Sequence, residues 1–242
     1  MTENTYSLPV METVKTAWAK VSGTKGSFWA IIGIVFVAQF IVGFLGGLGT
    51  KGGAIDIIFS IISSLIQIMA GASLIYMGIR RAQDTPIRWK MVRDVLTGRI
   101  ILYLILLYIL EMVIFIPAGL LAGVGVWLLH MQPEPTLMMQ VLAGVFFVAT
   151  AILFIFLAVR LWLAYGTVVD KKSNPWEAVK FSFKATRCNV WKLIGLYFVN
   201  VLIALLCVIT VGIGFIWGLP WFFIAYGEAY KRLSTRQDMR VG

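Results

Sequence analysis

Six segments of this chain are long and apolar enough to cross a lipid bilayer. They cover residues 28–48, 55–79, 100–129, 137–168, 191–211 and 213–231. A helical span needs about 20 apolar residues, because a helix rises about 1.5 Å per residue across roughly 30 Å of hydrocarbon. The runs lack the in-out alternation that strands of a membrane barrel require. With 60% apolar residues overall, the chain is predicted to be an all-α integral membrane protein with six transmembrane helices.

The basic residues lie almost entirely on one side of these segments. Nineteen of the 21 lysines and arginines precede the first span, follow the sixth, or lie in the second and fourth loops between spans. Loops rich in lysine and arginine stay in the cytoplasm, so both termini are predicted to be cytoplasmic. The net charge of +10 is therefore a topology signal rather than a sign of nucleic-acid binding. The first 26 residues are too polar for a cleavable signal peptide, and the compact loops favour a bacterial inner membrane.

A short pattern recurs three times along the chain. Each copy has a small polar residue two positions before a proline, an amphipathic segment, two spans and a closing tyrosine-glycine element. The opening elements are Ser7-Leu8-Pro9, Asp84-Thr85-Pro86 and Ser173-Asn174-Pro175, and the closing ones are Tyr76-Met77-Gly78, Tyr165-Gly166 and Tyr226-Gly227. We predict one membrane domain, residues 1–242, built from repeats 7–83, 84–172 and 173–236 as a pseudo-threefold bundle. Alternatively, the similarity only reflects the residue types favoured in any interfacial helix.

The amphipathic segments carry their cations off the apolar stripe, so each is predicted to lie flat at the cytoplasmic interface. Anionic headgroups attract such cations. The predicted face for anionic lipid or a protein partner comprises Lys15, Lys20, Arg88, Lys90, Arg93, Lys180, Lys184 and Arg187.

Two charged residues are predicted to lie deep in the membrane. Glu111 is about 12 residues, roughly 18 Å, into the third span, and Arg160 is about ten residues, roughly 15 Å, from the cytoplasmic end of the fourth. A lone charge at that depth costs about 2.5–3.5 kcal/mol or more. We therefore predict an ion pair between Glu111 and Arg160, serving either a polar cavity or a structural clamp. Alternatively, the fourth span slides and Arg160 reaches the interface.

A polar stripe follows the second span at helical spacing, through Ser60, Ser64 and Gln67. Gln39 and Asn200 add polar groups to the first and fifth spans. These side chains either form hydrogen bonds between helices or line a cavity.

Motifs for catalysis and cofactor binding are not recognisable. The sequence has no Walker A motif, no hydrolase signature and a single histidine, His130, without a cysteine cluster. A nucleotide-driven pump, a protein-built zinc site and known hydrolase mechanisms are therefore not expected. We predict a protein that is not an enzyme and has no cofactor or metal.

Three short stretches, Asn174-Pro175-Trp176-Glu177-Ala178-Val179-Lys180, Trp191-Lys192-Leu193 and Ala225-Tyr226-Gly227, resemble poorly characterised bacterial inner-membrane proteins. They are similar to the membrane domain attached to some bacterial glycerophosphodiester phosphodiesterases. The resemblance implies an all-helical membrane module. No soluble phosphodiesterase domain is recognisable here, so that activity is not implied.

Two functions fit these observations. The first is binding or translocation of a lipid or other small molecule in a cavity at the pseudo-threefold axis. The second is a membrane scaffold or assembly factor whose basic cytoplasmic face binds anionic lipid or a protein partner.

Overall fold

The computed structural model describes residues 8–47, 52–132 and 134–238, and within them the chain forms helices and no strand. Its elements in chain order are α1 (Val10–Ala19), α2 (Lys25–Gly46), α3 (Ala54–Ala82), the 3-10 turn η2 (Trp89–Met91), α4 (Val92–Val95), α5 (Gly98–His130), α6 (Leu137–Leu161), α7 (Ala164–Lys171), α8 (Pro175–Thr186), α9 (Val190–Ile209) and α10 (Phe215–Asp238).

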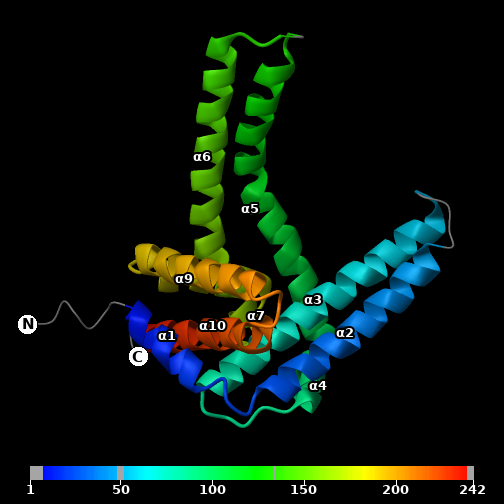
Figure 1. Ribbon diagram of the computed structural model, residues 1–242, viewed down its shortest axis with the longest axis vertical. Helices are drawn as coiled ribbons and strands as arrows, with labels where there is room; N and C mark the ends of the chain where they lie inside the picture. The colour runs from blue at the N-terminus through cyan, green and yellow to red at the C-terminus, as the bar shows by residue number, and fades with distance from the viewer. Residues whose placement is uncertain (1–7, 48–51, 133, 239–242) are drawn as a thin grey trace, which may run out of the picture.

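The long helices are arranged as hairpins that leave a common base in different directions. Figure 1 shows α5 and α6 standing upright, α2 and α3 extending to the upper right, and α9 and α10 lying across the base. The helices α2, α3, α5, α6 with α7, and α9 are long and apolar enough to cross a membrane by length and composition. The chain is therefore an all-helical, multi-pass membrane protein.

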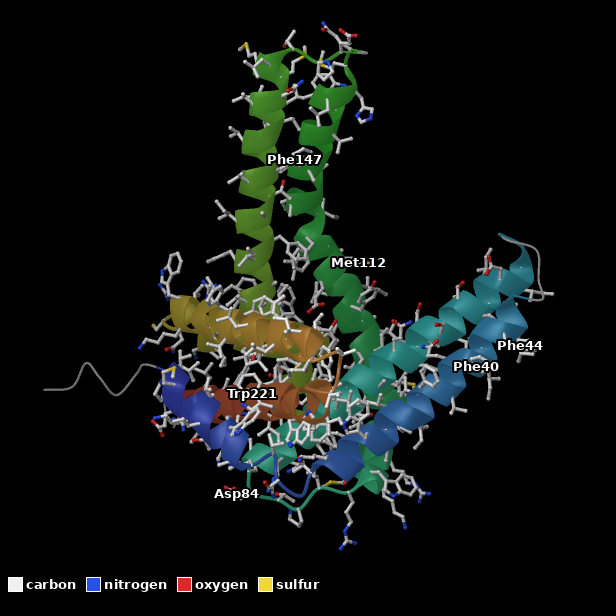
Figure 2. All side chains as sticks on the ribbon, viewed as in Figure 1. Phe40, Phe44, Asp84, Met112, Phe147 and Trp221 are labelled. Carbon is white, nitrogen blue, oxygen red and sulfur yellow. The ribbon has the colours of Figure 1, made fainter. Side chains whose placement is uncertain are left out.

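The segment predicted as the sixth span, 213–231, coincides with α10, which is not among these five helices. The reason lies in its second half, which carries Glu228, Lys231 and Arg232. The stretch of α10 from Trp221 to Tyr230 is also among the most enclosed parts of the described chain and lies at the base. Figure 2 shows Trp221 inside the base, whereas Phe40 and Phe44 lie far out on α2.

The amphipathic segments differ in how much helix they form. The first and third are α1 and α8, and α8 begins where the Asn174 side chain accepts a hydrogen bond from the Glu177 N–H and Pro175 takes the first helical position. The second, which follows Asp84-Thr85-Pro86, forms only one turn of η2 and one turn of α4. Its backbone is extended at Arg88 and leaves the helical region at Leu96. Ser7, which opens the first repeat, lies outside the described residues.

The tyrosine-glycine elements pack close together in the base. A Cβ atom placed on Gly78 would overlap the carbonyl group of Phe223, and one placed on Gly227 would overlap the backbone of Gly78. A Cβ on Gly166 would meet the Tyr226 hydroxyl and the Tyr230 ring. Missing side chains allow helix backbones to approach closely, so these glycines set how tightly α10 packs against α3 and α7.

Candidate functional site

A cavity of about 590 Å³ lies where the hairpins meet. Its walls come from α3, α5, α6, α7, α9 and α10, and they are mostly aromatic and aliphatic. Ile75, Phe115, Phe154, Tyr197 and Phe222 form much of this surface. Ligand sites are commonly concave and apolar with a few placed polar groups, and this cavity has that character.

The polar groups of the cavity include Glu111, Tyr165, Asn200 and Tyr226. The Tyr165 hydroxyl donates a hydrogen bond to Glu111 Oε2 at 2.8 Å. The Tyr226 hydroxyl accepts from the Gly166 N–H at 2.9 Å and donates to the Trp162 carbonyl, also at 2.9 Å. Asn200 Oδ1 is buried and has no hydrogen-bond partner among the residues that the structure describes. The cavity therefore offers an unused acceptor beside a carboxyl group.

A break between α6 and α7 positions this arrangement. The helix stops at Leu161 and restarts at Ala164, which leaves backbone groups that need partners. The Ser182 hydroxyl donates to the Arg160 carbonyl at 2.5 Å and accepts from the Leu163 N–H at 3.2 Å. The Tyr226 hydroxyl donates to the Trp162 carbonyl in the same break. Together these hydrogen bonds stabilise the break that precedes Tyr165.

The helix that carries Glu111 is itself bent. Pro117 lies inside α5, where it cannot donate the usual backbone hydrogen bond and kinks the helix. Figure 1 shows that α5 begins near α3, changes direction along its length and then runs beside α6. Glu111 precedes the proline by less than two turns, on the part of α5 that faces the cavity.

The predicted ion pair between Glu111 and Arg160 is replaced by two separate sets of contacts. Glu111 bonds to Tyr165, whereas Arg160 Nη1 donates to the Phe183 carbonyl at 2.7 Å. The Arg160 guanidinium also lies over the rings of Phe156 and Phe183, 5.3 and 5.4 Å from their centroids. The helical rise predicts how deep a residue lies in the membrane, but not the direction in which its side chain points. Arg160 lies at the end of α6, where its long side chain reaches the C-terminal carbonyls of α8.

The polar residues of α2 and α3 form one contact between the helices and several within α3. Gln39 Nε2 donates to the Ser63 carbonyl at 3.0 Å, and the Ser63 hydroxyl donates back to Gln39 Oε1 at 2.6 Å. Gln67 adds a longer bond of 3.4 Å to the Ser63 hydroxyl, and Ser64 bonds to the Ser60 carbonyl of its own helix at 2.9 Å. Gln39 is therefore bonded between the helices, whereas the bonds of Gln67 and Ser64 stay within α3.

The predicted cavity residues do not all lie at one site. Ser60 lines a separate cavity of about 540 Å³ between α2 and α3, together with Asp56. Among the five predicted cavity-lining residues, Asn200 is the one that lines the cavity beside Glu111.

Lys20 differs from the rest of the predicted basic face. Its ammonium lies 2.8 Å from Asp84 Oδ1 and 2.7 Å from Glu228 Oε1, and it donates to the Ala82 carbonyl at 2.8 Å. Burial disfavours the charge, but the two carboxylates outweigh it and raise the pKa of Lys20 above its usual value. Lys231 joins the same group through Asp84, at 3.6 Å, and the Ala82 carbonyl, at 2.8 Å. We call Lys20, Asp84, Glu228 and Lys231 the basal ion-pair network.

The other predicted basic residues are exposed on the surface: Lys15, Arg88, Lys90, Arg93, Lys180, Lys184 and Arg187. Lys20 is therefore not available to a lipid headgroup in the way that these side chains are.

Sequence reasoning missed Tyr165 and Tyr226 as cavity residues. The sequence showed their tyrosine-glycine elements only as the ends of repeats. Nothing in the local sequence indicates that the Tyr165 hydroxyl contacts Glu111 or that the Tyr226 hydroxyl contacts the break after α6. Comparison with protein-family models, with curated proteins and with solved structures finds no match.

Within residues 8–47, 52–132 and 134–238, no group of three or more His, Cys, Asp or Glu side chains could hold a metal ion.

Proposed function

We propose that this protein binds or translocates an amphipathic molecule, a lipid or a small membrane-soluble compound, through the cavity beside Glu111, and that it is not an enzyme. The observation that supports this most directly is the combination of an apolar cavity of about 590 Å³ with Asn200 Oδ1 buried and unpartnered in its wall. A buried acceptor without a partner costs about 1–3 kcal/mol, which a ligand that donates a hydrogen bond would recover.

The polar groups define the chemistry of the ligand. The Tyr165 and Tyr226 protons are already engaged by Glu111 and the Trp162 carbonyl. The groups left to interact with a ligand therefore include the acceptors of Glu111 and Asn200 and the hydroxyl of Tyr197. A headgroup with hydroxyl or ammonium donors fits this end, while an apolar body fits the aromatic walls.

The test is native mass spectrometry of the full chain released from nanodiscs, with identification of what remains bound. We expect a stoichiometric amphipathic molecule on the wild-type protein and its loss from Asn200→Leu, which keeps the branched shape of the side chain and removes the acceptor. Ser64→Ala is the control, because this hydroxyl bonds only within its own helix. Equal retention by all three proteins, or a wild-type protein that carries only exchangeable bulk lipid, would contradict the proposal.

The proposed topology has six crossings, with α10 as the sixth and both termini in the cytoplasm of a bacterial cell. The three successive helical hairpins and the packing of Gly78, Gly166 and Gly227 near one another support a threefold repeat. A reporter that is active only in the cytoplasm, fused to the C-terminus, would be active under this topology. Activity of a periplasmic reporter at the same position would contradict it.

A second function, as a scaffold that binds an anionic partner, is supported by the seven exposed cations of the basic face. Co-purification of a stoichiometric protein that is lost from Lys180→Gln/Lys184→Gln would favour this function over ligand binding. The same double substitution is not expected to change occupancy of the cavity beside Glu111.

A further inference from the structure

A further, smaller cavity of about 310 Å³ lies between α2, α3 and the η2–α4 segment. Its apolar walls include Val35 and Ala38 of α2 and Ile66 and Met69 of α3. We call it the α2–α3 groove. It shares no lining residue with the cavity beside Glu111, so the inference below does not rest on the proposed function.

Two cations and a tryptophan stand at the edge of this groove. Trp89, Lys90 and Arg93 all line it, and all three are exposed. The Lys90 ammonium lies 5.9 Å from the centroid of the Trp89 ring. Tryptophan favours the headgroup level of a bilayer, which indicates that these cations lie where lipid phosphates lie.

Lys90 and Arg93 are not neutralised by the protein. Among the described residues, neither has a carboxylate within 4.0 Å. By contrast, Lys20 and Arg232 are paired with carboxylates at 2.7 and 2.9 Å. The edge of the α2–α3 groove therefore carries two uncompensated positive charges above an apolar surface.

The wall of the groove is continuous with a surface that faces lipid. Ile34 lines the groove and is 57% exposed, and Phe36 on the next face of α2 is 71% exposed. A soluble anion would leave this apolar surface unused. A lipid places a phosphate at the edge and an acyl chain along the wall, which satisfies both parts.

We propose that the α2–α3 groove is a binding site for an anionic phospholipid of the surrounding bilayer. The phosphate lies between Lys90 and Arg93, and one acyl chain lies against Val35, Ala38 and Met69. Basic pockets next to membrane helices bind anionic headgroups through the same combination of charge and apolar contact. The site selects anionic over zwitterionic lipids because its charges have no internal counterion.

The first experiment measures lipid retention by the full chain in native mass spectrometry, with phosphatidylglycerol and phosphatidylcholine as probes. We expect Lys90→Gln/Arg93→Gln to reduce phosphatidylglycerol affinity about 30-fold, since each nearby cation contributes to headgroup attraction. Lys180→Gln/Lys184→Gln is the matched control. It removes the same charge, and Lys180 also lies over a tryptophan, 5.2 Å from the Trp176 ring, but neither lysine lines the groove. Equal losses in the two double variants would overturn the site, because they would indicate general surface attraction.

The second experiment tests the acyl chain. Ala38→Phe places a ring in the groove, whereas Val37→Phe places the same ring on the adjacent residue, which does not line it. We expect phosphatidylglycerol affinity to fall at least tenfold in Ala38→Phe and to change less than twofold in Val37→Phe. Unchanged affinity in Ala38→Phe, or full displacement of the lipid by millimolar inorganic phosphate, would overturn the lipid site and leave a simple anion site. The charge variants lie on the surface, so they remain informative if Ala38→Phe does not fold.

Discussion

The hydroxyl of Tyr165 donates a hydrogen bond of 2.8 Å to Glu111 Oε2, and this contact joins α7 to α5 inside an apolar cavity. The residues are 54 positions apart. The bond provides a partner for a carboxyl group that would otherwise be costly at this depth. It also holds the start of α7 just beyond the break that follows α6.

Replacing Tyr165 by phenylalanine should therefore destabilise the protein. We expect a loss of about 1–3 kcal/mol in the free energy of unfolding, because Glu111 loses its hydrogen-bond donor. The measurement is denaturant unfolding in detergent micelles. Tyr197→Phe is the control, since Tyr197 lines the same cavity, is 57% exposed and has no hydrogen bond among the described residues. Equal effects of the two substitutions would refute a specific role for the Tyr165 hydroxyl.

The packing of α10 against α3 leads to a second prediction, on glycine. Gly78→Ala should cost roughly 2–3 kcal/mol, because its Cβ would overlap the Phe223 carbonyl and force the helices apart. Gly71→Ala, two turns earlier on the same helix, meets no atom within 4 Å. It should be neutral or should stabilise the protein by about 0.4–1 kcal/mol. Thermal unfolding of both variants checks the difference, and a stable Gly78→Ala protein would contradict the close approach.

A third prediction concerns Arg160 and distinguishes its observed contacts in α8 from the ion pair with Glu111 that the sequence predicts. Arg160→Met should destabilise the protein by roughly 1.5–3 kcal/mol, because it removes a charge-assisted hydrogen bond to the Phe183 carbonyl. Hydrogen exchange should rise in α8. Arg187→Met, an exposed cation just after α8, is the control and should change little.

Charge reversal completes this test. Because Glu111 and Arg160 have different partners, the double variant Glu111→Arg/Arg160→Glu should be less stable than either single reversal. Recovery of wild-type stability in the double variant would restore the ion-pair hypothesis.

Acid should weaken the basal ion-pair network. The hydrogen bond from Lys20 lowers the pKa of Asp84 below its ordinary value of 3.8. The stability that this carboxylate contributes is therefore present above pH 3.8 and is lost as the pH falls through its lower folded-state pKa. We expect the melting temperature of the wild-type protein to fall more between pH 5 and pH 3 than that of Asp84→Asn. Asp94→Asn, an exposed carboxylate without an ion pair among the described residues, should follow the wild-type curve. Parallel curves for all three proteins would contradict a contribution from Asp84.

The sequence predicts the helices of this protein far better than their contacts. The predicted spans 28–48 and 191–211 agree with α2 and α9 to within a few residues, because long apolar runs in a membrane protein have little choice but to be helical. The break at Trp162 was not predicted, because it depends on Ser182 and Tyr226, which are distant in sequence.

Side-chain direction was the main source of error in the predicted site. Glu111 was correctly recognised as a polar group that needs a partner, but its partner comes from α7 rather than from Arg160. Lys20 was grouped with the exposed cations because its local sequence resembles theirs. Its pairing with Glu228 connects α1 to α10 across more than 200 residues, which no local pattern could indicate.

The burial of α10 has a consequence for the order in which the chain is made. Its second half packs against Gly78 of α3, and its Arg232 and Glu228 bind Glu12 and Lys20 near the start of the chain. Synthesis proceeds from the N-terminus, so α10 emerges after α1 and α3, against which it packs. Until then α1 lacks its partners and the Gly78 face of α3 is uncovered. The α2–α3 hairpin therefore forms before this part of the core is complete, and α10 completes it.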